Sequence, residues 1–92
     1  MNLDHIRQEI NQLDSQLVRL LEQRMHLVDQ VTAFKRQSGM AVLDSNREEE
    51  VLNRVANLVE NPIYQASIRA TFADIMSHSR AYQTEQLQAH EK

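Results

Sequence analysis

The sequence predicts an all-α fold of three helices per chain, one very long helix at the N-terminus and two shorter ones, in 92 residues. Glycine and proline, the residues that most strongly interrupt regular structure, occur once each, as Gly39 and Pro62. No stretch alternates apolar and polar residues as strands do, and aromatic residues make up only 4% of the chain. We therefore expect three helical segments divided at these two residues, within a single domain spanning residues 1–92.

The first helix is expected to run from about Leu3 to about Gln37. Its apolar residues recur in two sevenfold series that alternate steps of three and four, which is typical of a helix that packs along its whole length. Ser38 and Gly39 are expected to end it, because glycine readily adopts the left-handed conformation that follows a helix. The two series are Ile6, Leu13, Leu20, Leu27 and Phe34, and Leu3, Ile10, Leu17, Arg24 and Val31.

The length of this helix predicts a second chain. At 1.5 Å per residue it would be on the order of 50 Å long. A compact globule of this chain length would have a radius of gyration of only about 12–13 Å. The two later helices are too short to cover such a rod, so we expect an intertwined helical homodimer.

The second helix is expected to begin near Ser45, because S-N-R-E fits the capping-box pattern with Glu48 at the third helical position. It is expected to end at Asn61 and Pro62. The third helix then begins at the same place, with Asn61 as its N-cap and Pro62 at its first helical position.

Composition excludes several classes of function. The chain has no cysteine, so disulfides and thiolate metal sites are excluded, and the four histidines show no metal-ligand spacing. A net charge of −3 argues against a nucleic-acid binder. The N-terminus lacks a signal-peptide pattern, and no apolar run approaches the roughly 18 residues of a membrane span. We expect a cytoplasmic protein with no metal, cofactor, nucleic-acid or membrane partner.

Polar residues fall on the apolar face of each helix. At about 100° of rotation per residue, Arg24 points along the centre of the first apolar stripe, and Lys35 lies within about 20° of it. Glu48 lies near the middle of the second stripe, and Ser79 and Gln83 near the middle of the third. Buried charges are costly unless they are paired or bind a ligand. The set therefore indicates a pocket for a small anionic ligand inside the bundle.

Each of these residues also has a structural explanation. Arg24 would keep its stem in the seam and its head in water, or would fix the pairing register of a dimer. Lys35 would cap the last carbonyls of its helix, and Glu48 would close the capping box. A non-catalytic helical dimerisation module is therefore the alternative to an enzyme.

Five segments carry a resemblance to a known family. Together they span nearly the whole chain in order and with compatible gaps, and the chain resembles the all-α class, type II, of chorismate mutases, in monofunctional form. The segments are I-R-x-E-I-x-x-L-D (6–14), L-L-x-x-R-M (20–25), V-x-x-F-K (31–35), V-L-D-x-x-R-E (42–48) and I-M-x-x-S-x-x-x-Q (75–83).

The resemblance implies the cofactor-free [3,3] rearrangement of chorismate to prephenate, on the branch towards phenylalanine and tyrosine. Such a reaction requires a compact substrate conformer and stabilised negative charge on the ether oxygen. By position, Arg24 with Ser79 resembles the site for one substrate carboxylate, and Lys35 and Gln83 resemble the two donors to the ether oxygen. Arg7 resembles an arginine that reaches the other carboxylate from the partner subunit.

The loop and second helix supply the remaining residues implied by the resemblance. Glu48 resembles the acceptor for the ring hydroxyl, Asp44 lies beside it, and Arg47 resembles an arginine that supports the carboxylate-binding cluster. Isochorismate pyruvate-lyases and mutases of an amino analogue of chorismate share this fold and remain alternatives. An intact D-x-x-R-E segment with a carboxylate at Glu48 favours the hydroxylated ring of chorismate.

Overall fold

A computed structural model describes residues 2–90 of the chain. It contains α1 (Leu3–Ser38), α2 (Ser45–Leu58), a short 3-10 turn η1 (Pro62–Tyr64) and α3 (Gln65–His90). Residues 2–90 contain no strand. The predicted all-α architecture, with one very long helix followed by two shorter ones, is confirmed.

α1 has 36 residues, and both of its ends are capped. The side chain of Asn2 accepts hydrogen bonds from the backbone N–H groups of Asp4 and His5, at 2.9 and 3.3 Å. At the other end Gly39 has a φ of 73°, and its N–H donates to the carbonyl of Lys35 at 2.8 Å. The predicted end of the helix is confirmed, since a residue with a Cβ would be strained in this left-handed conformation.

α2 begins as predicted at Ser45, but its cap is different. Asp44 is the N-cap, in extended conformation, and its Oδ1 accepts from the N–H of Arg47 at 3.1 Å. The predicted capping box of Ser45 and Glu48 is therefore wrong. The aspartate, one residue earlier, satisfies the exposed N–H group and leaves the side chain of Glu48 free for another partner.

The boundary between the last two helices is longer than predicted. α2 ends at Leu58, three residues before Asn61. Asn61 does act as a cap, accepting from the N–H of Ile63 at 3.1 Å. The turn that begins at Pro62 is a 3-10 turn, however, and the α-helix starts only at Gln65. Short 3-10 segments are common at helix N-termini.

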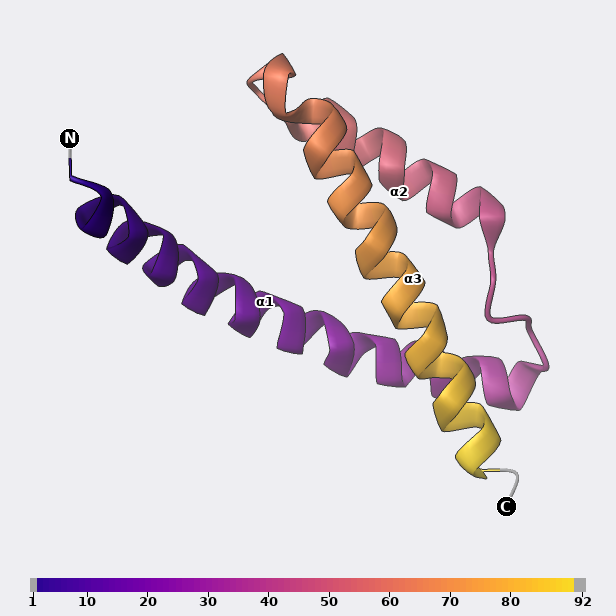
Figure 1. Cartoon of the computed structure of the whole chain (residues 1–92). Helices are drawn as coiled ribbons and strands as arrows, with labels where there is room; N and C mark the ends of the chain where they lie inside the picture. Colours follow the sequence, from indigo (N-terminus) through magenta and orange to yellow (C-terminus); the bar gives the residue numbers. More distant parts are fainter. Residues whose placement is uncertain (1, 91–92) are drawn as a thin grey trace.

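α2 and α3 lie antiparallel, and the C-terminal half of α3 crosses the C-terminal half of α1 (Figure 1). A small core holds α2 to α3: Val51, Val55 and Met76 are buried there, and Leu52 and Phe72 pack against them. The N-terminal half of α1 projects as a free arm (Figure 1). The radius of gyration is accordingly 16.4 Å, well above the value of about 12 Å expected for a compact chain of this size.

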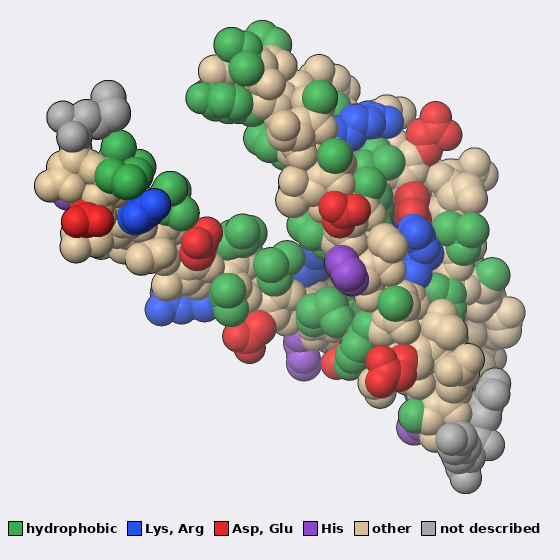
Figure 2. All heavy atoms as spheres, viewed as in Figure 1, with side chains coloured by type: hydrophobic (Ala, Val, Ile, Leu, Met, Phe, Trp, Pro, Cys, Tyr) green, Lys and Arg blue, Asp and Glu red, His purple; other side chains and the backbone are tan. Residues whose placement is uncertain are grey.

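The apolar seam of α1 is not covered by its own chain. Figure 2 shows hydrophobic side chains exposed along the projecting arm. Leu13 and Leu20 are 62% and 61% exposed, and Phe34 at the far end of the series is 60% exposed. Large contiguous apolar surfaces on soluble proteins mark interaction sites. Eight of the nine apolar seam residues are exposed, namely Leu3, Ile10, Leu13, Leu17, Leu20, Leu27, Val31 and Phe34.

Candidate active site

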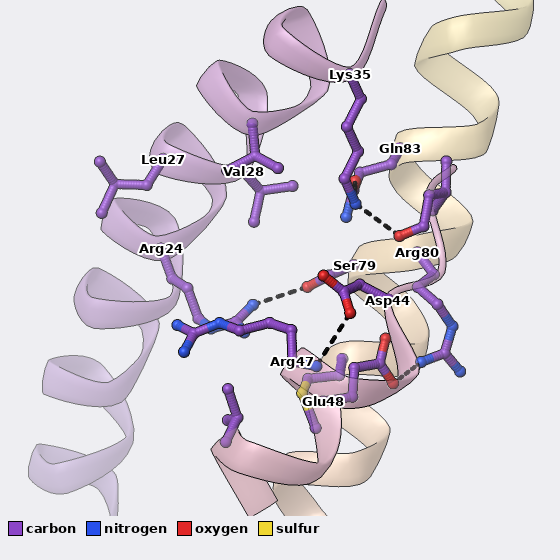
Figure 3. A pocket seen from close by; sticks show the side chains of 14 residues that line it. Arg24, Leu27, Val28, Lys35, Asp44, Arg47, Glu48, Ser79, Arg80 and Gln83 are labelled. Carbon is purple, nitrogen blue, oxygen red and sulfur yellow. Dashed lines mark hydrogen bonds and ion pairs between the residues drawn. The ribbon is translucent and has the colours of Figure 1, made fainter. Parts of the chain in front are cut away.

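A cavity of about 280 Å³ lies where α1, α2 and α3 meet. Its walls carry side chains from all three helices and from the loop before α2 (Figure 3). Seven of the eight residues singled out in the sequence line it, and Arg7 does not. The seven are Arg24, Lys35, Asp44, Arg47, Glu48, Ser79 and Gln83.

Arg24 and Ser79 form the first polar contact across the cavity. Arg24 Nη1 donates to Ser79 Oγ at 2.9 Å, joining α1 to α3. The hydroxyl of Ser79, which is buried, donates in turn to the carbonyl of Ile75 at 2.9 Å. With its own proton engaged, Ser79 presents a lone pair to the guanidinium and fixes its position.

Lys35 and Gln83 form the second contact, about one helical turn further along α3. Lys35 Nζ donates to the carbonyl of Val42 at 2.6 Å and to Gln83 Oε1 at 3.3 Å. The ammonium is therefore held by the loop before α2 and by α3, and does not cap the carbonyls of its own helix. Gln83 is buried, and the acceptor end of its amide faces the lysine, so its NH₂ group is the end free to donate.

The two cations have only neutral acceptors. Within residues 2–90, no carboxylate forms an ion pair with Arg24 or Lys35. Both side chains are half-buried on one wall of the cavity. A half-buried cation that is not neutralised attracts an anion more strongly than one in bulk water. The arrangement can therefore hold a ligand that carries negative charge.

α2 supplies the opposite wall. Glu48 is 22% exposed at its side chain and forms an ion pair with Arg80, which is 32% exposed. Figure 3 shows the side chain of Arg47 extending from α2 toward Arg24. Arg47 is 60% exposed at its side chain and has a long contact of 3.9 Å with Glu50. Asp44 caps the helix and also borders the cavity.

Arg80 is a cavity residue that the sequence reasoning missed. It lies four residues after Met76 and three before Gln83, and positions with these spacings share a helix face. Both neighbours line the cavity, so the spacing alone would have found it. The carbonyl of Val42 was also missed, and side-chain patterns carry no signal for a backbone acceptor.

Arg7 lies on the projecting arm of α1 and is exposed. It precedes Arg24 by 17 residues on the same helix. At 1.5 Å per residue this separation is about 25 Å, so the side chain is out of reach of its own chain's cavity.

On the outer side of the α1–α3 contact, Tyr82 donates a hydrogen bond to Asp29 Oδ1 at 2.6 Å. This hydrogen bond, with burial and the negative charges of Asp29 and Glu85 as smaller causes, raises the pKa of Tyr82 above its ordinary value. The contact ties the two helices together one residue before Gln83, and so contributes to holding that side chain in place.

No group of three histidine or acidic side chains in residues 2–90 is arranged to hold a metal ion. No helix in that part of the chain is long and apolar enough to cross a membrane.

Comparison with known proteins agrees with the chemistry of the cavity. A family model described as chorismate mutase type II matches residues 6–84. A chorismate mutase of Methanocaldococcus jannaschii is 26% identical over 87 residues, which cover 94% of this chain and 88% of that protein. Both comparisons favour an isomerase of chorismate over a lyase or a non-catalytic module. Because the family model covers well over half of its length, the chain belongs to the type II chorismate mutase family.

Proposed function

We propose that the cavity between α1, α2 and α3 binds chorismate and rearranges it to prephenate. The observation that carries this assignment is the pair of half-buried cations, Arg24 and Lys35, held only by neutral acceptors. Chorismate is a dicarboxylate with an ether oxygen that gains negative charge as the reaction proceeds. Two fixed cations on one wall match these two requirements.

Arg24 is the residue we assign to one substrate carboxylate. Its guanidinium has five donors, and one of them is used to bond Ser79. The remaining donors are available for a bidentate contact with a carboxylate. Since Ser79 is buried and fixed by Ile75, the arginine is positioned before the substrate arrives.

Lys35 and Gln83 are the donors we assign to the ether oxygen. Their mutual contact at 3.3 Å places an ammonium and an amide side by side on two different helices. In the rearrangement the C–O bond of the ether breaks while a new C–C bond forms, and no atom is gained or lost. Donors that are already in position stabilise the growing charge on the oxygen without having to reorganise. Such preorganised stabilisation is usually the largest contribution to the rate enhancement of an active site.

Glu48 is the acceptor we assign to the ring hydroxyl, with Asp44 beside it at the start of α2. Arg47 supports the cluster that binds the carboxylates, and its direction in Figure 3 agrees with this role. Holding the hydroxyl on one wall and a carboxylate on the other keeps the substrate in the compact shape in which the reacting carbons meet.

We further propose that the active unit is an intertwined homodimer, each copy contributing one domain of residues 1–92. Leu27 and Val31 support this arrangement, because they belong both to the exposed seam of α1 and to the lining of the cavity. A second copy that packs along the seam would therefore also close the open side of the cavity. The arm that carries Arg7 would then supply that residue to the second carboxylate in its partner's site.

The direct test is to incubate the purified chain with chorismate, in the presence of a chelator and without nucleotide, and to follow prephenate. Isochorismate is assayed beside it. Turnover of chorismate at a rate proportional to protein concentration is the expected result. Turnover of isochorismate alone, or of neither compound, would refute the assignment. Sedimentation at micromolar concentration tests the dimer, and a monomer there would refute both the shared cavity and the role of Arg7.

A further inference from the structure

Arg80 and Glu48 both line the cavity and form an ion pair, but the proposed reaction assigns a role only to Glu48. Arg80 Nη1 donates to Glu48 Oε1, joining α3 to α2 across 32 residues of sequence. Both side chains are partly buried and both line the cavity. Figure 3 shows the carboxylate of Glu48 turned toward Arg80 on one side of the cavity.

The pair leaves half of the carboxylate available. Arg80 occupies Oε1, and no donor among residues 2–90 bonds Oε2. A carboxylate offers about four lone-pair sites on its two oxygens. One oxygen is therefore anchored by a cation, while the other remains able to accept a hydrogen bond from a ligand hydroxyl.

We infer that Arg80 is a positioning residue, which holds Glu48 in the rotamer that presents Oε2 to the ring hydroxyl of the substrate. The inference rests on the proposed role of Glu48 and extends it to a residue on another helix. A glutamate has three side-chain torsions and samples several rotamers when it is unrestrained. The hydrogen bond and ion pair to Arg80 anchor one oxygen of the carboxylate, so they restrict the rotamers that Glu48 can adopt.

This role explains why Arg80 does not compete with the two substrate-binding cations. Its charge is offset by Glu48, whereas the charges of Arg24 and Lys35 are not offset by any carboxylate in residues 2–90. α1 and α3 thus carry three cations on the cavity wall. Arg24 and Lys35 are the two assigned to the ligand, and Arg80 is paired with a carboxylate of the protein.

The test is a double-mutant cycle on kcat/KM with chorismate, using Arg80→Ala, Glu48→Gln and the combined variant. Coupled residues in contact differ from additivity by about 2-fold to more than 100-fold. We expect Arg80→Ala alone to lower kcat/KM about tenfold. We expect it to change kcat/KM less than about twofold in the Glu48→Gln background, because no carboxylate then remains to be oriented. Arg80→Lys is expected to retain more of the wild-type kcat/KM than Arg80→Ala, since it keeps a cation that can donate to the same oxygen.

Arg69 provides the matched control. It also lies on α3 and also bonds α2, donating to Asn53 Oδ1 at 3.1 Å, but it does not line the cavity. Arg69→Ala removes a hydrogen bond between the same two helices, outside the cavity, and is expected to leave kcat/KM unchanged. Melting temperatures of both variants separate a loss of helix packing from a loss of orientation. If Arg80→Ala does not fold, Arg80→Gln takes its place in the cycle.

The outcomes are distinct. The positioning role is overturned if Arg80→Ala lowers kcat/KM equally in the wild-type and Glu48→Gln backgrounds. It is also overturned if Arg80→Ala leaves kcat/KM unchanged in the wild-type background while Glu48→Gln lowers it. Both outcomes leave the proposed function intact. A Glu48→Gln variant with wild-type kcat/KM overturns the role of Glu48 and this inference with it. Absence of chorismate turnover by the wild-type chain overturns the proposed function itself.

Discussion

Arg24 on α1 donates a hydrogen bond of 2.9 Å to Ser79 on α3, although the two residues are 55 positions apart in the chain. The contact lies between the long helix that projects from the molecule and the helix that crosses it. It fixes a cation on the wall of the cavity with a neutral partner, so no carboxylate within residues 2–90 offsets the positive charge.

Ser79→Ala is expected to raise the KM for chorismate about tenfold with a smaller change in kcat, because a hydrogen bond to a charged group contributes on the order of 1.5–3 kcal/mol. The arginine would remain but would no longer be fixed. Ser77→Ala, two residues earlier on α3 and exposed, is the control, and steady-state kinetics is the measurement. Equal KM values for the two variants would contradict the role of Ser79.

Lys35→Ala is expected to lower kcat by about 10²–10³, since removal of one preorganised donor to a developing charge typically has this effect. Circular dichroism should show unchanged helix content. Arg36→Ala removes the same charge from the next residue, which is exposed and outside the cavity, and should retain wild-type kcat. Near-normal turnover by Lys35→Ala would refute its assignment to the ether oxygen.

Mixing Arg7→Ala with Arg24→Ala is expected to restore activity that neither variant has alone. If Arg7 serves the partner's cavity, one site of each mixed dimer carries both substitutions and the other carries neither. Random exchange makes half of the dimers mixed, so about a quarter of wild-type activity should return. The measurement is turnover after unfolding and refolding an equimolar mixture. No recovery, with dimers present by sedimentation, would place Arg7 outside the site.

Tyr82 makes stability depend on pH in the alkaline range. Its pKa in the folded chain lies above the ordinary value near 10, because its hydroxyl donates to Asp29. The stabilisation by this hydrogen bond is therefore fully present below pH 10 and is lost as the pH rises through the folded-state pKa. The free energy of unfolding should fall above pH 10 in the wild-type chain, and less steeply in Tyr82→Phe.

Tyr64→Phe is the control for this experiment. It alters the other tyrosine of the chain, which is 58% exposed and whose hydroxyl makes no hydrogen bond within residues 2–90. Denaturant titrations between pH 8 and pH 11 should therefore show that the free energy of unfolding of Tyr64→Phe depends on pH as it does in the wild-type chain. If the free energy of unfolding of Tyr82→Phe falls with pH as steeply as in the wild-type chain, the contact with Asp29 contributes nothing to stability.

Local patterns in the sequence were sufficient to predict the number and order of the helices. The end of α1 at Gly39 follows from a single left-handed residue, and the cap at Asn61 follows from a side chain that bonds its own backbone. The cap of α2 was misplaced by one residue, because Asp44 and Ser45 are both good N-caps and periodicity does not choose between adjacent positions.

The sequence by itself determined the family, the three helices and the faces on which Arg24, Lys35, Glu48, Ser79 and Gln83 lie, because each depends on motifs or on the 3.6-residue period of one helix. Only the tertiary structure decided what these side chains touch. Arg80 meets Glu48, and Lys35 meets the carbonyl of Val42, because of how α3 crosses α1 and how the loop returns to α2. Such contacts join residues of different elements, so helical periodicity, which relates positions within one element, carries no information about them.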